Sequence, residues 1–164
     1  MTLKSLIGTL ILALSTWCAH AHEATVDIQN AWARATVKGQ MATGAFMTLT
    51  ARHSTRLISA STPVGVAQIH AMKMDNNVMQ MFELKEGLEL PAGKPVELKP
   101  GSYHIMLMDL KAPLDKDTQV PVTLVFKDKS NAEQSITLNL PVRAGMQPGM
   151  AMEHGNHQHM PAKP

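Results

Sequence analysis

Short apolar runs separated by turn-forming residues make up most of the chain and limit the folds open to it. Nine such runs are rich in β-branched residues and partly alternate apolar with polar positions, which is typical of strands. No segment keeps helical periodicity for three turns. The expected strands cover residues 25–28, 45–50, 56–61, 66–70, 78–84, 96–98, 104–109, 119–126 and 134–140. The pattern predicts an all-β fold, an antiparallel sandwich or small barrel with Greek-key connections.

The N-terminal segment has the features of a secretory signal. Lys4 supplies a positive charge, residues 6–14 form an apolar run too short to span a bilayer, and small residues at Ala19 and Ala21 suit a signal peptidase. Cleavage after Ala21 predicts a secreted protein without stable membrane insertion. It also removes Cys18, the single cysteine, so the mature chain has no thiolate nucleophile and no cysteine-based metal site.

The chain divides into three parts by composition. Its 164 residues suffice for one domain, which we expect over residues 22–143 after a signal peptide of residues 1–21. In residues 144–164 Gly, Pro, Gln, Met and His dominate, which predicts a flexible tail. A buried N-terminal helix is the alternative for the first part. A lipid anchor on Cys18 is disfavoured because the bulky Trp17 precedes it.

The composition argues against a nucleic-acid partner and draws attention to two residue types. Lys and Arg number 15 against 13 Asp and Glu, and aromatic residues are only 4%, so neither a basic stripe nor a stacking platform is present. By contrast, 13 Met and 8 His are unusual. Methionine in such numbers fills a core, forms an adaptable surface or supplies soft metal ligands.

The first Met/His cluster fits a hairpin. Asn76 and Asn77 are turn formers that tolerate positive φ, so they suit a two-residue loop. Residues at equal distances from that loop then face each other, and every second residue shares a face. One face would carry His70, Met72, Met74, Met79 and Met81. The alternative is that this face simply packs in the core.

The second cluster is a strand in which His104, Met106 and Met108 share one face, while Ile105 and Leu107 point into the core. Thioether sulfur is soft and imidazole is borderline, so a site built from both selects Cu(I) over Zn, Mg or Ca. Such ligands hold copper less tightly than thiolates would, which suits a protein that passes it on. A blue-copper electron-transfer site is excluded because the mature chain lacks Cys.

The third cluster is the tail, whose potential ligands are Met146, Met150, Met152, His154, His157, His159 and Met160. Its three imidazoles can bind Cu(II) and its thioethers Cu(I) without a preformed fold. The alternative is a solubilising terminus. His22 would become the first residue of the mature chain and offers an amine and an imidazole, while His53 is expected on the surface.

The combination of His70, Met81 and His104-x-Met106 in a secreted, Cys-poor β domain resembles the periplasmic copper chaperones called PCu(A)C. The segments 31–34 and 100–108 add to the resemblance, which covers about residues 25–140. It implies a cupredoxin-like β-sandwich with an exposed Cu(I) site made by these four residues. The stretch from Met81 to His104 is one residue longer than the commonest family spacing, so Met79 is the alternative to Met81.

The resemblance also implies partners. Family members help to load the dinuclear copper centre of cytochrome c oxidase, often with Sco-type proteins. We therefore expect a monomeric copper carrier, with a copper-bridged oligomer through the tail left open. Passive copper storage or detoxification is the alternative. A copper redox enzyme built on His22 is disfavoured, because no positioned acid, base or aromatic platform accompanies it.

Overall fold

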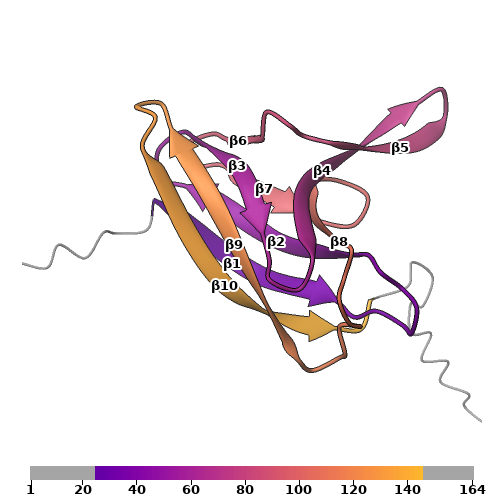
Figure 1. Cartoon of the computed structure of the whole chain (residues 1–164). Helices are drawn as coiled ribbons and strands as arrows, with labels where there is room; N and C mark the ends of the chain where they lie inside the picture. The colour runs from indigo at the N-terminus through magenta and orange to yellow at the C-terminus, as the bar shows by residue number, and fades with distance from the viewer. Residues whose placement is uncertain (1–24, 146–164) are drawn as a thin grey trace, which may run out of the picture.

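The computed structural model describes residues 25–145, which form ten strands and no helix (Figure 1). The all-β prediction is confirmed, and each of the nine predicted strands is present. Sequence reasoning missed the three-residue β6 and made β1, β4 and β10 too short. The strands are β1 (Val26–Arg34), β2 (Thr43–Ala51), β3 (Thr55–Ser61), β4 (Val66–Asp75), β5 (Val78–Glu83), β6 (Leu88–Leu90), β7 (Pro95–Leu98), β8 (His104–Met108), β9 (Gln119–Asp128) and β10 (Glu133–Arg143).

The strands join in the order β5-β4-β8-β2-β1-β10-β9-β3-β6, and β7 also pairs with β2. Among the described strands, β1–β2, β4–β5 and β9–β10 are hairpins, and the other connections run between strands that are not paired as ladders. The antiparallel prediction needs one correction, because β1 and β10 pair in parallel, with Ala33 opposite Val142. Parallel neighbours need a long connection, and here the connection consists of the whole chain from β2 to β9.

Alternating burial explains why the strands stack into a sandwich. In β9 the residues Val120, Val122, Leu124 and Phe126 are at most 1% exposed, while the residues between them are partly exposed. Side chains of a strand alternate between faces, so one face of β9 enters the core. From the other layer, Ile105 is fully buried against the same cluster. Burial of each such side chain contributes about 1.5–3 kcal/mol.

A β-bulge in β1 changes which residues face outward. Asn30 has a positive φ of 52°, and the register with β2 shifts between residues 29 and 32. Core-facing positions accordingly change from Val26 and Ile28 before the bulge to Ala31 and Ala33 after it. One unpaired residue reverses the alternation, so the even-numbered residues that follow lie on the outer face of the sheet.

The β4–β5 hairpin leaves the sandwich, as the upper right of Figure 1 shows. Ile69 and Ala71 in β4 are buried, but Met74 is 58% exposed, and every residue of β5 is exposed. Within the described residues no helix is long and apolar enough to cross a membrane.

Candidate metal centre

Two histidines from separate parts of the chain meet on the outer face of the sheet. β4 and β8 are antiparallel neighbours, and their register places His70 directly opposite His104. The ring centroids are 5.8 Å apart, and each residue is only 7% exposed. Ile105 points to the core from the next position, because β8 alternates between faces. The strand pairing therefore brings together two of the predicted ligands.

The His104 ring is held in a defined orientation. Its Nδ1 lies 3.0 Å from the carbonyl oxygen of Ser102, and this oxygen can only accept a hydrogen bond. Nδ1 must therefore donate, which leaves the lone pair of the neutral ring on Nε2. That Nε2 lies 3.3 Å from the Sδ of Met81, which also presents only lone pairs. Two lone-pair atoms this close suit a soft cation bound to both.

His70 offers a second unpaired nitrogen. Its Nε2 lies 2.9 Å from Oε1 of Gln68, to which it donates, while its buried Nδ1 has no hydrogen-bond partner. Burial is the main cause that lowers the pKa of His70; a neighbouring charge on His104 lowers it further, and Glu83 opposes both. The imidazole is therefore neutral at neutral pH, which is the form that binds a metal.

The hairpin brings Met81 to the histidines. Asn76 and Asn77 have φ values of 47° and 62°, as a two-residue type I′ turn requires, and the predicted register is confirmed. Met72 lies opposite Met81, and Met74 lies opposite Met79. Met81 contacts His104, whereas Met79 is two residues nearer the tip of the hairpin. The longer spacing between Met81 and His104 thus leaves these two residues in contact.

Met106 shares the outer face with His104, two residues further along β8. It is opposite Gln68 in β4 and Gly44 in β2. Gly44 is required by a close approach, since a Cβ there would lie 2.7 Å from the Cζ of Phe46. The Phe46 ring thus covers Gly44, the residue opposite Met106.

An aromatic and cationic cluster continues the same face beyond Phe46. The Trp32 ring lies 4.8 Å from the Phe46 ring between centroids, and the Arg34 guanidinium lies 5.5 Å from the Phe46 centroid. The side chain of Arg34 also packs against Gly145, where a Cβ would come within 2.8 Å of it. The polypeptide therefore reaches its last described residue on the face that carries the histidines.

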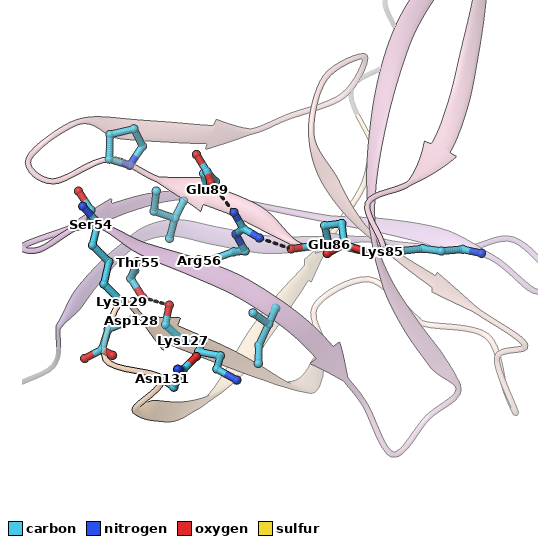
Figure 2. Close-up of a pocket in the computed structure, with 13 residues that line it drawn as sticks. Ser54, Thr55, Arg56, Lys85, Glu86, Glu89, Lys127, Asp128, Lys129 and Asn131 are labelled. Atoms are coloured by element: carbon cyan, nitrogen blue, oxygen red, sulfur yellow. Dashed lines mark hydrogen bonds and ion pairs between the residues drawn. The ribbon is translucent and has the colours of Figure 1, made fainter.

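Nitrogen, thiolate and carboxylate ligands do not gather elsewhere in the described region. Within residues 25–145 no group of three or more His, Cys, Asp or Glu could hold an ion. A pocket of about 640 Å³ lies elsewhere, between β3, β6 and the β9–β10 loop (Figure 2). In it Arg56 donates hydrogen bonds to Glu89 and to the backbone oxygen of Glu86, and no His or Met lines it. His53 is exposed, as predicted.

Sequence reasoning missed the residues that orient the two histidines. Gln68 and Ser102 each lie two positions before the histidine they hold. The alternation of faces along β4 could have pointed to Gln68, whereas the carbonyl of Ser102 has no residue-type signal. The tail ligands, His22 and the signal segment lie outside the described residues.

Comparison with known proteins places the domain. Residues 26–142 match the family described as "Putative lipoprotein LpqE-like". The Leifsonia xyli protein named "Putative lipoprotein Lxx21020" is 34% identical over 112 residues, which cover 68% of each chain. The Rickettsia prowazekii protein named "Uncharacterized protein RP573" is 32% identical over 114 residues, which cover 66% of this chain and 63% of that one.

Solved structures share the fold. The copper-bound PCuAC domain from PmoF2 aligns with a TM-score of 0.57 and 22% identity, over 74% of this chain and 95% of that domain. The Cu(I) form of DR1885 from Deinococcus radiodurans aligns with a TM-score of 0.58 and 26% identity, over 79% of this chain and 85% of that protein. The predicted cupredoxin-like fold is confirmed.

Proposed function

The chain belongs to the LpqE-like family, and from that premise we propose that it is a copper carrier that binds Cu(I) through His70, Met81, His104 and Met106. It is not an enzyme in this proposal, because copper is its cargo. The likeness to copper-binding PCuAC domains supports a copper chaperone.

The observation that carries the proposal is the approach of His104 to Met81. Their Nε2 and Sδ atoms, 3.3 Å apart, both present lone pairs, and His70 adds a buried Nδ1 with no partner in the described structure. Neutral soft and borderline donors favour Cu(I) over harder divalent ions. Met106, on the same face of β8, completes a set of two His and two Met.

The exposure of Met81 supports release as well as binding. Its side chain is 47% exposed, whereas His70 and His104 are only 7% exposed. An acceptor can therefore approach from the methionine side and replace one ligand at a time, so that copper is never free in water. The acceptor that we propose, on the likeness to PCuAC domains, is a copper protein such as a cytochrome c oxidase subunit or a Sco-type protein.

We further propose that the tail collects copper, either Cu(II) or Cu(I), beside the folded site. Gly145 packs on Arg34, and two strand spacings of about 4.8 Å separate β1 from β8. Met150 follows Gly145 by five residues, which can span roughly 17 Å when extended. An export signal cleaved after Ala21 fits this role, since the tail would meet copper in the periplasm.

X-ray absorption on the Cu(I)-loaded protein tests the folded site. To remove competing ligands, we would use a tail-substituted chain of full length, with tail His changed to Asn and tail Met to Leu. We expect two nitrogen and two sulfur neighbours at one equivalent of Cu(I). Met106→Ile should remove one sulfur at nearly constant volume. An unchanged spectrum in both Met106→Ile and His104→Ala would refute the site.

Copper storage is the second candidate, favoured by the seven potential ligands of the tail. It differs in where the capacity lies. A storage protein should lose most of its bound copper in the tail-substituted chain, and a carrier should keep one firmly bound Cu(I) that it passes to a copper-accepting domain. Equilibrium dialysis and transfer measured by gel filtration separate the two.

A further inference from the structure

The outer part of the β4–β5 hairpin carries a second set of thioethers. Met74 and Met79 are 58% and 45% exposed, and the thioether beside His104 is that of Met81. Large exposed apolar side chains cost hydrophobic stabilisation, so a cluster of them calls for a reason. Met72 lies two residues before Met74 on β4, opposite Met81; it is half-buried and shares the same face.

The register places these side chains at the closest cross-strand separation. The backbone N–H of Leu84 donates to the carbonyl of Ile69, which makes that pair a hydrogen-bonded one. Pairs alternate along an antiparallel ladder, so Met72–Met81 and Met74–Met79 are of the non-hydrogen-bonded kind. In such pairs the Cβ atoms are about 4.5–5.5 Å apart.

From this geometry we propose a second Cu(I) site formed by Met72, Met74 and Met79. Methionine is unbranched and has three rotatable side-chain bonds, so three sulfurs from adjacent positions can converge on one ion. Three neutral thioethers select a soft monovalent ion. Lys73 and Asp75 lie on the opposite face, so neither a cation nor a hard carboxylate ligand competes within the trio.

The position of the trio gives it a role that rests on the proposed function. Met72 is directly opposite Met81, which contacts His104. Copper held at the exposed tip can thus pass to Met81 by exchanging one thioether for another. The second site is an entry and exit port for the His/Met site, reached by an acceptor without opening the buried histidines.

Methionine-methyl NMR on the full chain tests the second site, with Cu(I) itself as the probe under anaerobic conditions. We expect one equivalent to shift the ring signals of His70 and His104. Further Cu(I) should shift the methyls of Met72, Met74 and Met79 together, with one shared binding curve. The methyl of Met47, which is 2% exposed in the core, should not move and serves as the internal control.

A variant measures capacity and exchange. In the tail-substituted chain, Met72→Leu, Met74→Leu and Met79→Leu together should lower Cu(I) capacity by one equivalent and slow copper removal by a chelator about tenfold. Met41→Leu is the matched control, since Met41 is 54% exposed but lies outside the hairpin. Unshifted methyls or an unchanged capacity would overturn the second site. Shifted methionine methyls with unshifted histidine rings would instead overturn the proposed function and support the second site alone.

Discussion

The interior of the sandwich and the β4–β5 hairpin use methionine in opposite ways. Met47 in β2 is 2% exposed and fills space between the layers, whereas Met74 in β4 is 58% exposed and touches mainly solvent. In the interior the methionine side chain contributes volume and apolar area, whereas on the hairpin it presents a sulfur lone pair to solvent. The fold thus depends on the interior, whereas the proposed Cu(I) binding uses the exposed methionines of the hairpin.

A truncation in the core should have the largest effect on stability. Leu107 is fully buried in β8, and Leu107→Ala should lower the free energy of unfolding by about 2–5 kcal/mol, from lost burial and a residual cavity. Met74→Ala should change it by no more than about 0.5 kcal/mol, because the side chain is exposed. Urea unfolding of the apo protein measures both. Equal losses would mean that the hairpin is part of the cooperative core.

Loss of a proposed histidine ligand should have its main effect on Cu(I) affinity. In the tail-substituted chain, His104→Ala should raise the Cu(I) dissociation constant by roughly 100-fold, about 2.7 kcal/mol, since even indirect supports of metal ligands are worth 10–100-fold. Competition with a Cu(I) chelator provides the measurement. His53→Ala is the control, because His53 is exposed and lies in the connection between β2 and β3. Similar Cu(I) dissociation constants for the two variants would show that His104 is not a ligand.

A substitution at Gly44 tests whether the proposed site depends on the Phe46 ring that covers this glycine. Gly44→Ala brings a Cβ to 2.7 Å from the Phe46 ring, which is held beside Trp32 and cannot move freely. We expect a loss of stability of about 1–3 kcal/mol and weaker Cu(I) binding, because a displaced ring disturbs Met106. Adding Phe46→Leu should restore part of both losses in a double-mutant cycle. Simple additivity would show that the ring and the glycine act separately.

Much of this arrangement could be predicted from residues close in sequence. The Asn76-Asn77 turn fixes the register of its hairpin, and period two then fixes the face of each methionine. The same alternation separates Ile105 from His104 on β8. Such inferences succeed because turn type and pleat are local properties of the backbone.

The rest depends on contacts between distant segments. The parallel pairing of β1 with β10 arises only when the two layers close, and no local pattern marks it. Nor does the sequence show that Trp32 would lie against Phe46, because the bulge at Asn30 sets which residues of β1 face that ring. The short β6 was missed because three residues carry too little periodicity.

The turn itself allows a local test of the hairpin. Asn77 has a φ of 62°, and Asn77→Ala should destabilise the hairpin by about 1–2 kcal/mol, because alanine disfavours that conformation. Hydrogen exchange of the β4–β5 amides should speed up by roughly 5–30-fold, while β9 and β10 keep their rates. Asn77→Gly, which suits the turn, should not speed exchange. Faster exchange throughout would mean that the hairpin and the sandwich open together.

The smallest effect is expected for Asp128, a charged residue in the layer opposite His70 and His104. The Asp128 carboxylate accepts hydrogen bonds from Ser130 N, Ser130 Oγ and Ala132 N, at 2.7, 2.6 and 3.0 Å. These bonds, that from the Ser130 side chain foremost, lower the pKa of Asp128. Its stabilisation is therefore complete above the unfolded value of about 3.9 and is lost as the pH falls through the lower folded value.

Asp128→Asn, which carries no charge at any pH, should be slightly less stable than the native chain at pH 7 and should approach it below pH 3. Urea unfolding across that range gives the difference, and Cu(I) binding at pH 7 should be unchanged because the β9–β10 loop lies on the other layer. A stability difference that persists to the lowest pH would assign the effect to lost packing instead of charge. A change in copper affinity would mean that the two regions are coupled through the core.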